Sequence, residues 1–239
     1  MIKFFRQIRK SLLMENKTSK YFKYAIGEIV LVVIGILIAL SVNNWNEQRK
    51  LKSEETKLLI EMQSALTGDL EDIKLNIAEH ESSHKSCLLI SKVLSEGLPY
   101  QDSLKFYFGD ALNTTRFGHR PGPYETLKTK GVDLIANDSL RLKLSEYYDR
   151  RVPYQFDLQE LSLENFAQAK ERQFELFKGF YTYEGIEPID YNALRENQYY
   201  LSWLDYTADV RWWEAKQFRD LKERIEQLLR HIDHELNSK

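Results

Sequence analysis

The longest apolar run in the chain is the nineteen-residue stretch from Tyr24 to Val42, in which Glu28 is the only charged side chain. An α-helix rises about 1.5 Å per residue, so this stretch is about as long as the hydrocarbon core of a bilayer is thick. The mean hydropathy of the whole chain is −0.50, so the remaining sequence is not membrane-like. The pattern predicts one membrane-spanning helix over residues 24–42, in contact with the lipid bilayer.

Beyond the span, apolar residues recur every three, four or seven positions, which is typical of a helix with one apolar face. The recurring residues are Leu51, Leu58, Met62, Leu66 (or Ala65), Leu70, Ile73 and Ile77. No proline interrupts residues 43–96, and glycine and proline follow directly after them. We expect a stalk of one or two helices there, kinked near Gly68 or broken near Ser82 and Ser83.

Helical patterns also dominate residues 97–239, which we expect to form a helical domain that packs with the stalk. The expected helices are Asp102–Asn113, Tyr124–Lys130 and Tyr154–Phe177, and a long helix follows Pro188. A further helix is capped by Asn137 or Asp138 and ends before Pro153. Loops are expected at 117–123 and 182–188. The last helix could pack back along the first. The sequence therefore predicts an all-α fold with an N-terminal transmembrane helix, a long stalk helix and an extracytoplasmic helical bundle.

Charge is unevenly distributed around the span. Residues 1–23 carry seven basic side chains and one acid, and their amphipathic pattern is typical of a helix that lies on anionic lipid headgroups. Fewer basic residues follow the span, and this bias favours a cytoplasmic N-terminus. We expect a single-pass protein of the cell inner membrane whose C-terminal domain is periplasmic. The alternative is a signal peptide cleaved after Ala39-Leu40-Ser41.

Composition excludes several classes of protein. Cys87 is the only cysteine, so the chain has no intrachain disulfide and no cysteine-based zinc site, and its apolar neighbours favour a buried small side chain. The net charge of −2 gives no basis for nucleic-acid binding. No phosphate-binding loop, dinucleotide fingerprint or serine-hydrolase elbow is present. We therefore expect neither enzyme activity nor a cofactor.

One catalytic motif does occur, because His80, Glu81 and His84 form an H-E-x-x-H sequence. On a helix the two imidazoles lie one turn apart and could share a zinc ion, with the glutamate activating a bound water. Polar neighbours surround the motif, whereas zinc proteases of this type place it in an apolar helix. We interpret it as a solvated helix face, and a zinc-dependent hydrolase remains an alternative with His80 and His84 as its metal candidates.

Small residues line one side of the predicted span. Gly35 and Ala39 are four residues apart, and Gly27 lies two turns earlier on the same stripe, which permits close approach of two helices in lipid. The near-heptad stalk residues could continue this contact as a parallel coiled coil, or could pack against the C-terminal helix of their own chain. A homodimer is therefore expected. Glu28 lies about one turn inside the span and can extend to the interface.

Three sequence blocks resemble an uncharacterised family of bacterial single-pass membrane proteins. They are the opening MIKFFRQIRKSLL, the span YAIGEIVLVVIGILIAL and its exit NNWNEQRK. A weaker element, YETLKTKGVDLIANDSLRLKLSEYYD, covers residues 124–149. The resemblance implies a bacterial membrane protein and brings no activity, cofactor or catalytic residue to any position.

The anchor, stalk and helical domain together favour a membrane-anchored interaction or scaffolding module of the bacterial envelope, acting on an unidentified protein partner. A ligand-sensing envelope domain is an alternative, because a helical bundle can enclose a pocket that the sequence does not reveal. The third hypothesis is the zinc hydrolase described above. A structure of the residues beyond the span separates these hypotheses best.

Overall fold

The structure, a computed structural model, describes residues 18–181 and 185–238, so the basic segment over residues 1–17 lies outside the described part. Its elements are α2 (Thr18–Ser95), α3 (Leu104–Ala111), α4 (Gly122–Lys130), η1 (Val132–Leu134), α5 (Asp138–Ser145), η2 (Glu146–Arg151), α6 (Val152–Leu176), β1 (Phe177–Tyr181), β2 (Gly185–Pro188), α7 (Tyr191–Glu196) and α8 (Gln198–Asn237). The predicted all-α class is confirmed. The chain divides into two compact units, Met1–Glu55 and Thr56–Lys239, which are described separately.

In the first unit, α2 exposes its apolar side chains along the whole predicted span. The most apolar 18-residue window has a mean hydropathy of 2.7, and none of it is buried. Ile29, Leu37 and Val42 are each about 60% exposed, and no atom comes within 4 Å of a Cβ built on Gly27 or Gly35. Among the described residues, this is the one helix long and apolar enough to cross a membrane.

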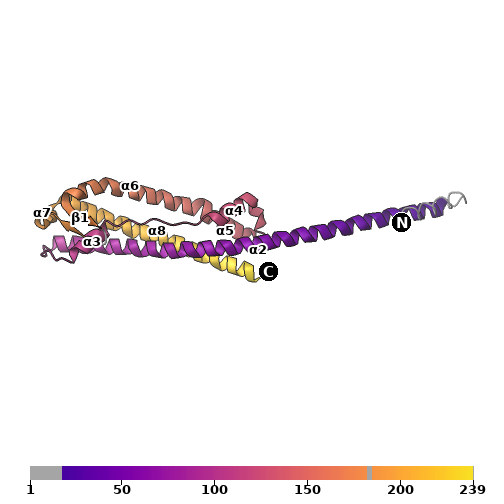
Figure 1. Cartoon of the computed structure of the whole chain (residues 1–239), viewed down its shortest axis with the longest axis horizontal. Helices are drawn as coiled ribbons and strands as arrows, with labels where there is room; N and C mark the ends of the chain where they lie inside the picture. Colours follow the sequence, from indigo (N-terminus) through magenta and orange to yellow (C-terminus); the bar gives the residue numbers. More distant parts are fainter. Residues whose placement is uncertain (1–17, 182–184, 239) are drawn as a thin grey trace. The chain divides into compact units, whose positions relative to one another are not determined.

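In the second unit, α8 runs antiparallel to the later part of α2 (Figure 1). Hydrogen bonds join Gln63 to Asp233 near one end of the pair and Ser91 to Asp205 near the other. The periodic stalk residues Leu58, Met62, Leu66 and Ile73 are buried in one apolar core with α4, α5 and residues 218–232 of α8. Beyond Leu51 the seam is therefore covered by its own chain, so the small residues of the span remain the only basis for the expected homodimer.

A second apolar core lies at the far end of this unit. It joins residues 87–94 of α2 to α3, the β-hairpin and residues 200–208 of α8. Cys87 is fully buried in it, and burial raises the pKa of the Cys87 thiol to about 12. The cysteine is therefore a small core side chain, as its neighbours in the sequence predict, and not a nucleophile.

Helical structure continues from α5 through η2 into α6, although the sequence analysis places a break at Pro153. A proline inside an α-helix clashes with the carbonyl four residues earlier. Here the preceding turn, Glu146–Arg151, is a π-helix, and the N–H of Val152 bonds to the carbonyl of Tyr147, five residues back. A π turn is wider than an α-helical turn, and Pro153 lies in the first turn of α6 without ending the helix.

Two other expectations are wrong in detail. Residues 185–188 are not loop, because β2 pairs antiparallel with β1 in the register Phe177 to Pro188. Gly185 has a φ of 81°, and a Cβ there would lie 2.8 Å from the backbone of Lys105, so only glycine fits. The final helix is also divided at Asn197, whose side chain accepts the N–H of Tyr200 and starts α8.

Candidate functional site

A buried polar face on α2 begins beside the first apolar core and reaches the edge of the second. Its residues follow helical spacing and include Asp69, Asn76, His80, Ser83 and Ser86, each less than 5% exposed. Residues 110–120, which we call the strap, run along this face in the opposite direction to α2. Buried polar side chains need partners, and most of those on this face find them in the strap.

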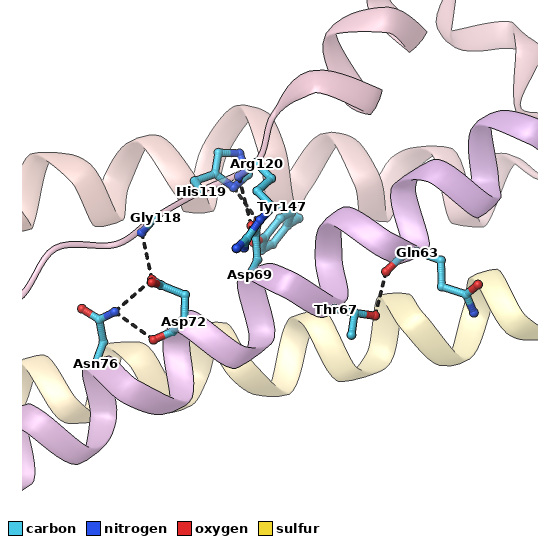
Figure 2. Close-up of polar contacts among 9 residues, drawn as sticks. All are labelled: Gln63, Thr67, Asp69, Asp72, Asn76, Gly118, His119, Arg120 and Tyr147. Carbon is cyan, nitrogen blue, oxygen red and sulfur yellow. Dashed lines mark hydrogen bonds and ion pairs between the residues drawn. The ribbon is translucent and has the colours of Figure 1, made fainter.

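One end of the strap is fixed by Asp69, which has no exposed surface. Its Oδ2 lies 2.6 Å from Nδ1 of His119 and 3.3 Å from the Tyr147 hydroxyl. Its Oδ1 accepts the backbone N–H of Arg120 at 3.0 Å and lies 3.4 Å from Nη1 of the same residue. Figure 2 shows these groups converging on one carboxylate from the strap and from η2. Asp69 therefore holds three residues in place.

The next two turns of α2 continue the pattern. Asp72 accepts the N–H of Gly118 at 2.8 Å, and Nδ2 of Asn76 bonds to the Asp72 carboxylate at 3.0 Å, as Figure 2 shows. The Thr115 hydroxyl donates to Oδ1 of Asn76 at 2.8 Å. The helix α2 continues without a break through Gly68, Ser82 and Ser83. The missing side chain of Gly68 leaves room for the Arg120 guanidinium, which a Cβ would meet at 2.7 Å.

The other end of the strap is held by the turns of α2 that follow. Asn113 donates to Glu79 at 2.5 Å, and Ser82 and Ser86 donate to Asp110 at 2.8 and 2.6 Å. The α2 residues in these contacts are three or four positions apart, so they share one helix face. A helical turn rises about 5.4 Å and an extended chain about 3.3 Å per residue, so each turn meets about two strap residues.

Between the two cores, three charged or titratable side chains meet away from water. His80 is 4% exposed, Arg211 2% and Glu214 6%. Nδ1 of His80 lies 3.2 Å from Oε2 of Glu214, which also accepts from Nη1 of Arg211 at 2.8 Å. The His80 ring stacks on Phe218, and Nη2 of Arg211 donates to the strap carbonyl of Asn113 at 2.8 Å.

The interpretation of His80 as part of a solvated helix face is therefore wrong. The H-E-x-x-H residues make three separate contacts: His80 meets Glu214, Glu81 pairs with Arg219 at 2.6 Å, and Nδ1 of His84 lies 2.8 Å from the carbonyl of Ala208. Within residues 18–181 and 185–238, no three histidine, cysteine or acidic side chains gather as metal ligands would. Nothing in this arrangement supports the zinc alternative.

His80 makes stability depend on pH. Burial lowers the pKa of His80 from 6.5 to about 4, while nearby Glu214 acts to raise it and Arg211 to lower it. In the unfolded chain His80 takes up its proton near 6.5, so its contribution to stability is complete above that pH and is lost as the pH falls toward 4. We expect this residue to remove about 3 kcal/mol of unfolding free energy between pH 7 and pH 4.

The measurement is urea unfolding at both pH values, with His80→Gln as the matched variant that keeps a polar amide but does not titrate. On acidification, the unfolding free energy of the wild type should fall by about 3 kcal/mol more than that of this variant. Equal losses in the two proteins contradict a buried neutral His80.

Four residues of this site, Asp69, Asp72, Arg211 and Glu214, were not singled out from the sequence. A signal was present, because Asp69 falls in the inward row with Leu66 and Ile73, and Arg211 falls in the inward row of α8. A charged residue at an inward position indicates a buried ion pair or a hydrogen-bonded carboxylate. The signal indicates burial but does not identify the partners, which for Asp69 lie 50 or more residues away.

Taken together, the fold defines a class: a predominantly helical protein with one bare apolar helix that is compatible with a single membrane crossing. Within that class, the chain belongs to DUF6090, a family of unknown function, which matches residues 28–191. The resemblance to an uncharacterised family is thereby confirmed. A search of curated proteins and a search of solved structures each found no match.

Proposed function

We propose that the chain is a single-pass protein of the bacterial inner membrane whose helical domain is an interaction or scaffolding module on the periplasmic side. The observation that carries the proposal is the apolar window of α2, with a mean hydropathy of 2.7 and no burial. A soluble protein rarely exposes so large an apolar surface, because its transfer to water is unfavourable. Lipid is the environment that such a helix surface fits.

The direction of insertion follows from charge. Seven basic residues precede the span, and four, the last of them Lys57, follow within about 15 positions. This bias supports a cytoplasmic N-terminus. The strap, which Asp69 and Asp72 hold along α2, gives the domain beyond the span a defined surface, and such a surface supports an interaction role. The bound partner is proposed to be a protein of the envelope.

The topology is tested with paired reporters in a Gram-negative host. Alkaline phosphatase, which is active only outside the cytoplasm, should be active when fused after Lys239 and silent when fused after Lys10. Green fluorescent protein at the same two positions should give the reverse pattern. A silent phosphatase after Lys239 contradicts the proposed orientation, and a mature N-terminus near Val42 establishes cleavage.

A span variant tests the anchor itself. A lysine at the centre of a membrane helix costs about 2.5–3.5 kcal/mol on insertion scales. Ile34→Lys/Leu37→Lys should therefore move the protein from the carbonate-resistant membrane fraction to the soluble fraction. The matched variant Ile34→Ala/Leu37→Ala should stay in the membrane, and release of both variants to the same extent argues against burial of this segment in lipid.

A further inference from the structure

Helix α6 is loosely seated on the rest of its unit. Of its 25 residues, only Val152, Gln155 and Gln173 are buried. Gln173 has no exposed surface, and neither its Nε2 nor its Oε1 has a hydrogen-bond partner among the described residues. A well-packed core rarely leaves a buried amide unpaired on both atoms. The inner side of α6 therefore carries a buried amide whose hydrogen-bonding groups have no partner among the described residues.

A cavity of about 220 Å³ lies beside the C-terminal half of this helix. Its apolar walls come from Leu112 of the strap, Phe166 of α6, and Phe180 and Ile186 of the hairpin. An apolar cavity of about 150 Å³ is sufficient to bind benzene. This cavity can therefore hold an aromatic ring with a short chain attached.

Lys170 is the one charged side chain among the described residues that line the cavity. Lys170 lies on the same lining as Phe166, one turn further along α6, and its side chain is exposed. Gly109, Asn113 and Thr114 complete the described lining, and none of the described lining residues is acidic. A lysine ammonium beside apolar walls, with no acidic side chain among the described lining residues, suits a ligand that has an apolar body and one anionic group.

We propose that this cavity binds a small amphipathic carboxylate, with its apolar body against Phe166 and Phe180 and its carboxylate at Lys170. The lysine cation favours a negatively charged ligand, so neutral ligands of the same shape bind more weakly. The volume sets the size of the apolar body at about that of a phenylpropyl group. The site gives the ligand-sensing hypothesis a definite location and ligand class, which the scaffolding role does not require.

The test uses the full chain in nanodiscs of zwitterionic lipid, because detergent monomers would compete for an apolar cavity. The probe is a ring-fluorinated phenylpropanoate observed by fluorine NMR, and empty nanodiscs correct for partition into lipid. We expect saturable binding in the millimolar range or tighter. The alcohol of the same carbon skeleton, which lacks the charge, should bind about three- to fivefold more weakly, as for an exposed ion pair.

Variants locate the site. Lys170→Met should weaken the phenylpropanoate about three- to fivefold and leave the alcohol unchanged, while Lys170→Arg keeps the wild-type affinity. Lys85→Met removes an exposed lysine that does not line the cavity and should change nothing. Leu112→Trp fills the cavity and should abolish binding of both probes, with Thr114→Trp in its place if that variant fails to fold.

Three results overturn the proposal. The first is the absence of saturable binding to the wild type. The second is binding that survives in the variant that fills the cavity, because the probe then lies elsewhere. The third is equal affinity for acid and alcohol, or no effect of Lys170→Met, because either shows that the charge is not recognised. None of these results depends on the orientation of the span, so the reporter and probe experiments fail independently.

Discussion

Replacing Arg211 with methionine should lower the free energy of unfolding by about 3–5 kcal/mol. Arg211 neutralises Glu214 at 2.8 Å, and Glu214 is only 6% exposed. Without the guanidinium a carboxylate is left buried with a neutral His80 as its remaining partner. The strap carbonyl of Asn113 also loses its donor. The measurement is urea unfolding of the purified full chain, followed by circular dichroism.

Two control variants make this prediction specific. Arg211→Met/Glu214→Leu removes both charges and should recover most of the loss, because a buried pair is often replaceable by apolar residues at little cost. Lys216→Met changes a neighbouring lysine on α8 that is exposed and should shift stability by less than about 0.5 kcal/mol. A loss below about 1 kcal/mol for Arg211→Met contradicts a desolvated ion pair at this position.

Replacing Asp69 with alanine should have the second largest effect, a loss of about 3 kcal/mol or more. The substitution removes the acceptor for His119, Arg120 and Tyr147 together. Hydrogen bonds to a charged group contribute about 1.5–3 kcal/mol each, and a buried donor left without a partner adds its own cost. Unfolding free energy and amide hydrogen exchange of the strap measure the two consequences.

The exchange data distinguish a local from a global effect. In Asp69→Ala the amides of Gly118 and Arg120 should exchange faster than those of the α2–α8 core. Glu79→Ala, which removes an exposed contact to Asn113 at the other end of the strap, should cost about 1 kcal/mol or less. Equal protection of the strap in wild type and Asp69→Ala contradicts its attachment through this carboxylate.

Much of the helical layout could be predicted because it depends on short-range pattern. The row Leu58, Met62, Leu66 and Ile73 gave the phase of α2, and that row is buried. Asn137 or Asp138 was expected as a cap, and it is the side chain of Asn137 that accepts the N–H of Leu140. The errors were also local: the π turn before Pro153 and the new start at Asn197 each depend on geometry that hydrophobic spacing does not encode.

The site could be predicted much less well, because its chemistry comes from residues far apart in the sequence. His80 occurs in a metal-binding motif, yet its main polar contact is Glu214, more than 130 residues later. Residues 117–123 were expected to form a loop because of their prolines and glycines, and they include only the last four residues of the strap. Its hydrogen bonding along α2 depends on Asp69 and Asp72, which precede His119 and Gly118 by nearly 50 residues. Pairings of this kind require the tertiary fold.

The π turn at Glu146–Arg151 has a consequence for the angular setting of α6. A π turn contains about one residue more than the α-helical turn it replaces, and each residue rotates a helix by about 100°. Deleting one residue there would restore a regular turn and rotate α6 by about that angle. Phe166 and Gln173 would then leave the inner side of α6. The presence of one additional residue in the π turn, about twenty positions before Phe166 and Gln173, therefore determines which side chains border the cavity.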